Sequence, residues 1–243
     1  DTFIVPGESY RQNIPSGPCK AYPDGFMLRK RLDVHVPMNA FLSFIGWWIS
    51  EGWTNNGQRK HGNRDYTSQD YGIGLNQKSD ATVECEAIES SISALPFNFY
   101  RSVRTEIYKC VNGYTYSGTT KTWATSNKSL WTWLRNNCGT DSRTKRIPAF
   151  VYDLPSSQQK LLLNALKLGD GHDRSEVNNR YTTVSPQLAD DVQSLAIQCG
   201  EPCNVYGPDE NGRLRVTIGK RHDHHTVYGE HISRVAYDGT VWC

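Results

Sequence analysis

Two stretches of the chain, one in each half, repeat a single pattern of apolar and polar positions. Residues 39–52 are apolar for about three helical turns and then carry an acid, Glu51, directly followed by a glycine. Residues 156–171 have a leucine-rich body and end in the same way, with Asp170 before a glycine. Each run predicts a helix, and the glycine after each acid predicts a left-handed residue that ends it. We therefore expect two matched helices, each with an acid at its carboxyl end.

Several predicted helices begin with residues whose side chains can cap a helix. Asn39 opens the first matched helix, and Ser156 with Gln159 has the spacing of a capping box at the start of the second. Asp80 precedes a third helix, and Ser185 precedes a fourth that begins with proline. These residues predict side-chain caps at four helix starts.

The elements that follow the two matched helices come in one order. After the first helix, the pattern predicts a strand, a helix, two strands and a short closing helix, at residues 71–77, 81–95, 99–111, 116–126 and 129–139. After the second, it predicts a strand, a helix and two strands, at residues 178–184, 186–199, 203–207 and 213–219. The assigned elements give helix–strand–helix–strand–strand in both halves, which we interpret as the order helix–strand–strand–helix–strand–strand occurring twice. We expect an α+β fold with two pseudo-symmetric αββαββα repeats built on antiparallel sheets.

The repeats divide the chain into four parts. Residues 1–35 form an N-terminal extension, residues 36–147 the first repeat and residues 148–234 the second, with a C-terminal tail at residues 235–243. An arginine- and lysine-rich piece at residues 141–155 joins the repeats, and its prolines indicate a linker.

Small residues recur at matching positions of the two helices. Gly46 and Ser50 lie five residues and one residue before the first acid, and Ala165 and Gly169 lie at the same distances before the second. Small residues four apart on one face let two helix backbones approach closely. The pattern predicts a helix interface made by these four residues, with the two acids side by side at one end. Two unrelated amphipathic core helices are the alternative.

The two acidic helix ends resemble a known pair of motifs. Residues 44–52 (FIGWWISEG) and 163–171 (LNALKLGDG) are similar to the nine-residue motifs of the LAGLIDADG endonucleases. Residues 145–171 and 180–200 look most like the endonuclease domains that sit inside inteins, and the similarity extends from about Val36 to Arg221. Glu51 departs from the aspartate in the family's motif, but it still supplies a hard oxygen ligand.

The resemblance implies a sequence-specific double-strand DNA endonuclease, a homing endonuclease that hydrolyses phosphodiester bonds at a long pseudo-symmetric site. The two sheets would then form a DNA-binding saddle. Glu51 and Asp170 would bind Mg²⁺, or Mn²⁺ or Ca²⁺ in crystals, with Ser50 and Gly169 beside them in the metal site. Two divalent ions about 4 Å apart can activate water and relieve charge on the attacking and leaving oxygens.

In this family a basic residue from each half assists catalysis, and Lys121 and Lys220 are the candidates here. Strict alternation along residues 214–220 places Lys220 on the apolar side of its strand, unless Gly219 marks a bulge. Solvated phosphate contacts, or plain surface positions, explain both lysines equally well.

Alternating polar residues on the predicted strands are suited to contacts with DNA. Arginine, asparagine and threonine on one face of a strand can reach base edges and phosphates in a major groove. The candidates for DNA binding are Arg104, Asn178, Arg180, Thr182, Arg213, Arg215 and Thr217. A sheet with one face in water shows the same alternation.

Composition and charge exclude little beyond a membrane span. No apolar run reaches the ~18 residues that a membrane helix needs, and no signal peptide opens the chain, so we expect a cytoplasmic protein. The net charge of +2 hardly favours nucleic acid by itself. The seven cysteines are interpreted as reduced thiols, against a disulfide alternative. The histidines of residues 222–231 are interpreted as part of a solvated loop.

Other functions compatible with the same sequence remain. One is a catalytically inactive, nucleic-acid-binding protein of the maturase type, which would share the fold. The other is a fragment of a protein-splicing intein, because residues 231–243 are similar to a splicing-domain strand. Splicing needs a nucleophilic first residue and a terminal His-Asn pair, whereas the chain runs from Asp1 to Cys243. We therefore expect a nuclease without splicing activity that is a monomer, since two repeats already supply the internal pair.

Overall fold

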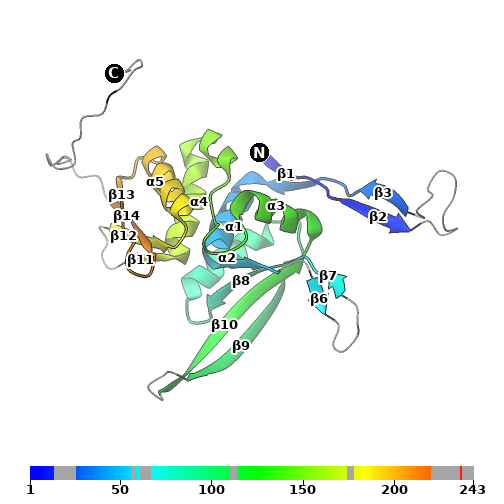
Figure 1. Ribbon diagram of the computed structural model, residues 1–243, viewed down its shortest axis with the longest axis horizontal. Coiled ribbons are helices and arrows are strands. Elements are labelled where there is room, and N and C mark those ends of the chain that lie inside the picture. The colour runs from blue at the N-terminus through cyan, green and yellow to red at the C-terminus, as the bar shows by residue number, and fades with distance from the viewer. Residues whose placement is uncertain are drawn as a thin grey trace.

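A computed structural model gives the structure of residues 1–13, 26–55, 58–60, 67–109, 114–173, 178–219 and 236. The predicted α+β class is confirmed: helices lie against antiparallel sheets (Figure 1). The helices are α1 (Met38–Glu51), α2 (Thr82–Ser93), α3 (Lys128–Cys138), α4 (Ser156–Gly169) and α5 (Pro186–Gln198), with a 3-10 helix at Ala149–Asp153. Within these described residues, no helix combines the length and the apolar character needed to cross a membrane.

Two four-stranded antiparallel sheets form the body of the protein. The first has the order β5-β8-β10-β9, made of β5 (Gly52–Thr54), β8 (Gly72–Lys78), β10 (Thr115–Ser126) and β9 (Tyr100–Lys109). The second has the order β11-β12-β14-β13, made of β11 (Gly171–Asp173), β12 (Asn178–Thr183), β14 (Leu214–Gly219) and β13 (Cys203–Tyr206). Three two-stranded ribbons accompany them: β1 (Thr2–Val5) with β4 (Val34–Pro37), β2 (Ser9–Asn13) with β3 (Phe26–Lys30), and β6 (Gln58–Lys60) with β7 (Thr67–Gln69).

The two sheets have the same topology. In each half a helix runs directly into a short edge strand, and a second helix connects the second strand to the remaining hairpin. The sequence pattern missed the short strands β5 and β11, because three residues are too few to show alternation. It also missed β6 and β7 of the first half, whereas the remaining predicted elements follow one another in the observed order. The closing helix expected in the second repeat would follow Gly219, outside the described residues.

One face of each sheet is covered by helices and forms the core. In the first sheet Ile73, Leu75 and Trp123 are fully buried, and in the second Tyr181 and Val216 are. In the second sheet these residues alternate with exposed or half-buried ones along their strands, as expected for a sheet with one covered face. In the first sheet Gly74 and Ala124 are buried as well, and the ring of Trp53 lies against Gly74. The face opposite the helices is therefore open in the second sheet and partly covered by Trp53 in the first.

The N-terminal segment contributes to the core of the first half. Val5 on β1 and Val36 on β4 are fully buried, and the Phe3 ring stacks on Phe41 of α1 with 4.8 Å between centroids. Phe3 also contacts Trp133 of α3 at 5.3 Å. The segment predicted as an extension thus includes a strand, β1, that packs against α1 and α3.

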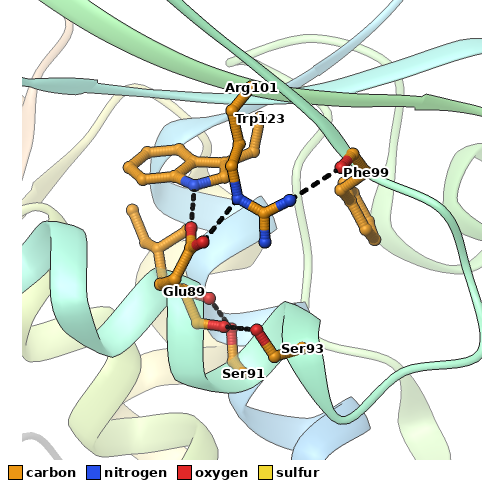
Figure 2. A network of polar contacts seen from close by, with 7 residues as sticks. Glu89, Ser91, Ser93, Phe99, Arg101 and Trp123 are labelled. Atoms are coloured by element: carbon orange, nitrogen blue, oxygen red, sulfur yellow. Dashed lines mark hydrogen bonds and ion pairs between the residues drawn. The ribbon is translucent and has the colours of Figure 1, made fainter.

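A small polar network fixes α2 to the first sheet (Figure 2). The Glu89 carboxylate accepts hydrogen bonds from Trp123 Nε1 on β10 and from Arg101 Nε on β9. Arg101 also donates to the carbonyl oxygen of Phe99, at 3.0 Å. Because burial of an indole N–H without an acceptor is costly, this carboxylate lets Trp123 pack fully under α2.

The predicted glycine ends of the matched helices are wrong. Gly52 is extended, with φ −93° and ψ 153°, and Gly171 does not have a positive φ either. At both positions the chain passes straight from helix to strand, so no left-handed residue is needed. Gly52 has a steric role instead, because a Cβ there would lie 2.3 Å from the carbonyl oxygen of Trp48.

Three of the predicted side-chain caps are also wrong. Prolines precede α1 and α4 at the cap positions, and α2 is preceded by Ala81, so Asn39, Ser156 and Asp80 cap nothing. Gln159 turns away from its predicted partner and donates to the carbonyl oxygen of Leu154, at 3.0 Å. The cap at Ser185 is confirmed, since its hydroxyl accepts from the Leu188 amide at 3.2 Å. The described cysteines, Cys85, Cys138, Cys199 and Cys203, are free thiols.

Candidate active site

The helices α1 and α4 pack directly on each other at the positions of their small residues. A Cβ built on Gly46 would lie 2.6 Å from the Cβ of Ala165 and 2.7 Å from the carbonyl oxygen of Leu162. A Cβ built on Gly169 would lie 2.5 Å from the Cβ of Ser50. All three distances are far below van der Waals contact, so the interface requires residues as small as these.

This packing brings the two acids together where the helices end. Glu51 is the last residue of α1 and Asp170 directly follows α4, and their charges interact. Glu51 accepts a hydrogen bond from Gln77 of β8, with 3.2 Å between Nε2 and Oε1. Asp170 accepts one from the Tyr181 hydroxyl of β12, at 3.5 Å. Each acid is thus oriented by a side chain from its own sheet.

The pKa values of both carboxyl groups are higher than those of the same groups in water. Burial, together with the neighbouring charge of Asp170, raises the pKa of Glu51 to about 7. Burial raises the pKa of Asp170 to about 6, although Lys145 and Tyr181 act in the opposite direction. The main cause of both shifts is desolvation, and perturbed carboxyl groups of this kind are typical of functional sites.

Lys145 is a basic residue whose charge acts on both acids. Its ammonium donates to the carbonyl oxygens of Trp48 and Gly52, each at 3.0 Å, and lies 5.2 Å from the centre of the Trp48 ring. Burial lowers the pKa of Lys145 to about 8, although the charges of Asp170 and Glu51 oppose that shift. The lysine therefore satisfies carbonyl groups at the end of α1 and places a cation at both carboxylates.

The sequence analysis missed Lys145 because it treated residues 141–155 as a linker. Ile147 and Val151 in that segment are buried, and the Ile147 amide donates to Asp191 of α5 at 2.8 Å. Apolar residues around the prolines were the available signal, since a solvated linker has no reason to carry them.

A cavity of about 320 Å³ opens beside Asp170. Its lining includes Ser50, Lys145, Asp170, Tyr181, Thr182 and Arg213. The cavity next to Asp170 is therefore lined by polar and ionisable groups from three parts of the chain. They come from α1, from the segment between the halves and from the second sheet.

Of the two lysines proposed from the sequence, the structure describes only Lys121. Lys121 lies on β10 opposite Gln77, with its ammonium 5.0 Å from the Trp123 ring, and its charge acts on Glu89 and Cys85. The lysine whose charge acts on both acids is Lys145. Lys220 and the histidines of residues 222–231 lie outside the described residues.

The polar residues expected to bind DNA lie on the uncovered face of the second sheet. Arg180 pairs with Thr217 and Thr182 pairs with Arg215 across β12 and β14, and all four alternate with the buried core residues of these strands. Arg213, just before β14, is exposed and lines the cavity. The side chain of Asn178, at the start of β12, lies outside the described part of the chain.

Arg104 lies on the edge strand of the first sheet. It is exposed on β9 and forms an ion pair with Glu106 at 3.4 Å. Trp53 of β5, two residues after Glu51 in the sequence, lies on the same face of the sheet as Arg104. It is 38% exposed. A Cβ built on Gly74 would lie 2.4 Å from its ring, so the indole rests flat on the backbone of β8.

The acids are not part of a larger cluster of metal-binding side chains. Within the described residues, no three or more histidine, cysteine, aspartate or glutamate side chains gather in a way that could hold an ion. Any ion at Glu51 and Asp170 would therefore need further oxygen ligands from water or from a bound molecule.

Comparison with curated proteins finds three relatives with unrelated names. The ATP-dependent Clp protease proteolytic subunit of Chlamydomonas moewusii is 32% identical over 173 residues, 71% of this chain and 15% of that protein. The iron-sulfur cluster assembly SufBD family protein ML0593 of Mycobacterium leprae is 38% identical over 77 residues, 31% of this chain and 9% of that protein. The ATP-dependent DNA helicase Hel308 of Thermococcus kodakarensis is 35% identical over 86 residues, 33% of this chain and 8% of that protein. The chain thus spans 15% or less of each relative, and no family model matches it.

Comparison with solved structures finds proteins of similar fold and low identity. The homing endonuclease I-DmoI, in complex with DNA and manganese, has 15% identity and a TM-score of 0.48, covering 75% of this chain and 90% of that one. The homing endonuclease I-WcaI, bound to its DNA recognition sequence, has 11% identity and a TM-score of 0.47, covering 76% of each chain. The N-terminal LAGLIDADG domain of DUF199/WhiA has 10% identity and a TM-score of 0.40, covering 76% and 77%. The structural neighbours of this chain are LAGLIDADG homing endonucleases and the LAGLIDADG domain of WhiA.

Proposed function

We propose that this protein is a sequence-specific endonuclease that hydrolyses phosphodiester bonds of double-stranded DNA. The observation that carries the proposal is the pairing of Glu51 and Asp170, one from each topologically equivalent half, around the half-buried Lys145. Two equivalent halves that meet at a pair of acids match the two strands of a duplex, which are related by an approximate two-fold axis. Uncovered faces with arginine and threonine flank this pair.

The donor set fits a divalent ion such as Mg²⁺. Glu51 and Asp170 offer hard carboxylate oxygens, and desolvation raises the pKa of both, with the charge of Asp170 adding to the shift at Glu51. Ser50 and Gly169 directly precede the two acids and pack closely on each other at the same end of the helix pair. When bound, such an ion would lower the pKa of a water and relieve charge on the phosphate oxygens.

The chain's own residues would position the reacting groups. Gln77 and Tyr181 orient the two carboxylates, so each is held toward the junction of the halves. Lys145 carries its proton on Nζ at neutral pH, and this charge would offset that of an incoming phosphate. With its pKa near 8, the same ammonium can also give up a proton at little cost.

Specific binding would come from the uncovered faces of the sheets. On the second sheet, Arg180, Thr182, Arg215 and Thr217 form a polar surface beside the cavity, with Arg213 at its edge and Asn178 at the start of β12. Arg104 would add a contact from β9. Arginine and threonine side chains on strands can reach both base edges and phosphates.

We also propose that this segment occurs as an insertion in other proteins, as inteins do. Its three curated relatives are named as a protease subunit, an iron-sulfur assembly protein and a helicase, and each is matched over a small share of its length. A segment shared by proteins of such different names supports an inserted unit rather than a part of each host's own activity. A monomer is proposed because α1 already has its partner in α4.

Cleavage of a randomised duplex library in the presence of Mg²⁺, followed by sequencing of the cut ends, tests the function and gives the target. The double variant Glu51→Gln, Asp170→Asn keeps the shape of both side chains and removes their charge. It is expected to lose cleavage by several orders of magnitude while still binding the selected duplex. Asp190→Asn, on the exposed side of α5, is the matched control and should cut normally.

Either of two outcomes would reject the nuclease. Cleavage by the double variant at the wild-type rate would show that the acids are not the active site. Tight binding of DNA without cleavage by the wild type, with any divalent ion, would instead indicate an inactive binding protein of the maturase type.

A further inference from the structure

The ribbon formed by β2 and β3 stands away from the body of the protein. Figure 1 shows it extending beyond β1 and α3, outside both four-stranded sheets. Its strands pair with each other from Ser9 opposite Lys30 to Asn13 opposite Phe26. Near its base, Lys128 of α3 donates to the Ser9 carbonyl oxygen at 2.8 Å, and the Glu8 amide donates to Ser129 at 3.2 Å. The ribbon is therefore an arm fixed at its base, and we call it the β2–β3 arm.

The β2–β3 arm carries an excess of positive charge. Arg11 lies on β2, Arg29 and Lys30 on β3, and Arg31 directly follows. Among the described residues of the arm, only Lys30 forms an ion pair, with Asp33 at 3.3 Å. Two of the arginines instead lie over aromatic rings, Arg11 5.7 Å from the Phe26 ring and Arg31 5.5 Å from the Tyr10 ring. Cations held over aromatic rings keep their charge and their hydrogen-bond donors free for a partner.

Apolar side chains on the arm are also uncovered. Leu28 is 72% exposed and Phe26 42% exposed, and Tyr10 of the opposite strand is exposed as well. The register places Leu28 beside Arg11 on one face, and Tyr10 beside Arg29 on the other. Each face therefore combines positive charge with an apolar or aromatic contact. A free two-stranded ribbon gains little stability of its own, so a function in binding is a reason for its presence.

We infer that the β2–β3 arm binds duplex DNA outside the segment held by the two sheets. This inference rests on the proposed function, which brings a duplex to the same molecule. A two-stranded ribbon has the width that a major groove accepts, its arginines can neutralise phosphates, and its aromatic groups can pack on sugars and base edges. The arm lies beyond the four-stranded sheets, so its contacts fall on flanking base pairs.

The test compares two lengths of the selected duplex, one limited to the cleaved site and one extended by about ten base pairs at each end, roughly a helical turn of DNA. The variant Arg11→Gln, Arg29→Gln, Arg31→Gln removes three positive charges from the arm. Wild-type protein is expected to bind the longer duplex more tightly than the short one. When salt is raised from 50 to 200 mM, its affinity for the longer duplex should fall by a factor about 40 times larger than the factor measured for the variant. On the short duplex the two proteins should bind and cut alike.

Two further variants distinguish charge from folding of the arm. Arg11→Lys, Arg29→Lys, Arg31→Lys keeps the charge and should restore the advantage of the longer duplex. Lys160→Gln, on the exposed side of α4, removes a charge elsewhere and should leave that advantage intact. In addition, trypsin should cut the wild-type chain after residues 29–31, and only the longer duplex should protect it.

The outcomes separate this inference from the proposed function. The role of the arm would be overturned if the wild type bound both duplex lengths with equal affinity, or if the glutamine variant gained as much affinity from the longer duplex as the wild type does. Neither result would contradict the proposed nuclease activity. Failure of every protein to bind or cut either duplex would overturn both.

Discussion

The two halves share one topology, but their uncovered faces differ beside the acids. Gly52 pairs with Leu75 in the first sheet and Gly171 pairs with Tyr181 in the second, which aligns the two registers. By this alignment, the pair Gly74 and Ala124 of the first sheet corresponds to Arg180 and Thr217 of the second, and the pair Asn76 and Thr122 corresponds to Thr182 and Arg215. The second half thus presents two arginines where the first presents small or neutral residues.

The first half fills this position with an indole. Trp53 lies flat over Gly74, and its Nε1 donates to Asn76 at 3.3 Å, while the Thr122 hydroxyl donates to the same amide oxygen at 2.9 Å. An arginine at position 74 could not coexist with this packing. The same strand frame therefore supports a cationic surface in one half and an aromatic, neutral surface in the other, which suits two half-sites of different sequence.

The covered faces differ as well. Asp170 is oriented by Tyr181, whereas the aligned residue in the first half is Leu75, and Glu51 is oriented by Gln77, whose aligned residue is Thr183. Lys121, a candidate from the sequence, aligns with Leu214. The halves therefore orient their acids from different strand positions, and the described position that aligns with Lys121 in the second sheet holds no lysine. One lysine, Lys145, faces both acids instead.

The largest expected effect concerns which half cuts which strand. Glu51→Gln and Asp170→Asn, made separately, are each expected to lower double-strand cleavage of a plasmid target by at least about 100-fold while leaving nicking of one strand. The two variants should nick opposite strands, which sequencing of the nicked product reveals. Loss of both cuts by either single change would mean that the acids share one central ion.

A second prediction concerns the helix pair that joins the halves. Gly46→Ala is expected to destabilise the protein by about 2–4 kcal/mol, because its Cβ would meet the carbonyl oxygen of Leu162 as well as Ala165. Gly169→Ala should cost less, since the Ser50 side chain that it meets can shift. Chemical denaturation measures both.

Matched variants make this prediction specific. Ala165→Gly should partly rescue Gly46→Ala, whereas Asn164→Ala, on the exposed side of α4, should be nearly neutral. If Gly46→Ala unfolds at the wild-type denaturant concentration, the two helices are not in close contact.

Sequence patterns predicted this interface but could not predict the lysine beside it. Small residues at matching distances from two acids are local signals, readable one helix at a time, and the same is true of the alternation that separates Arg215 from Val216. Lys145 reaches the acids only because its segment packs against α5, through Ile147 and Asp191, and such a contact leaves no periodic trace. The helix ends failed for a related reason: the strand pairing of Gly52 overrides the usual preference of glycine after a helix.

A smaller effect is expected from the charge of the acids on stability. The pKa of Glu51 is raised to about 7 in the folded protein, so ionisation opposes folding, and wild-type stability falls as pH rises from about 4.5 to 7. Glu51→Gln should therefore be more stable than wild type by about 1–2 kcal/mol at pH 8 without divalent ions, after allowing for partial exposure, and the difference should vanish near pH 4.

Asp170→Asn provides the comparison between the halves. The Asp170 carboxyl of the wild type has a pKa of about 6 in the folded protein, so its ionisation lowers stability between about pH 4 and 6. The stability difference between Asp170→Asn and the wild type should develop in that range. Mg²⁺ at pH 8 should raise the melting temperature of the wild type and have little effect on the double variant. A wild type that is more stable than Glu51→Gln at pH 8 without metal would contradict the raised pKa.

The last prediction tests the difference between the uncovered faces. Arg180→Ala and Arg215→Ala are each expected to weaken binding of the selected duplex by about 1–3 kcal/mol and to reduce the slope of log affinity against log salt by about one. Trp53→Ala should weaken binding by a similar or smaller amount and leave the slope unchanged, because an indole displaces no counterion. Gly74→Ala should behave like Trp53→Ala, since a Cβ 2.4 Å from the ring must lift the indole from β8 without changing any charge. A change in the base pairs of one half-site should then reduce binding least in the variant that already lacks the contact to that half-site. This variant is Trp53→Ala for the first half and Arg180→Ala or Arg215→Ala for the second. If Trp53→Ala and Arg215→Ala change the salt slope equally, the two faces bind DNA in the same way and the aromatic surface of the first half has another role.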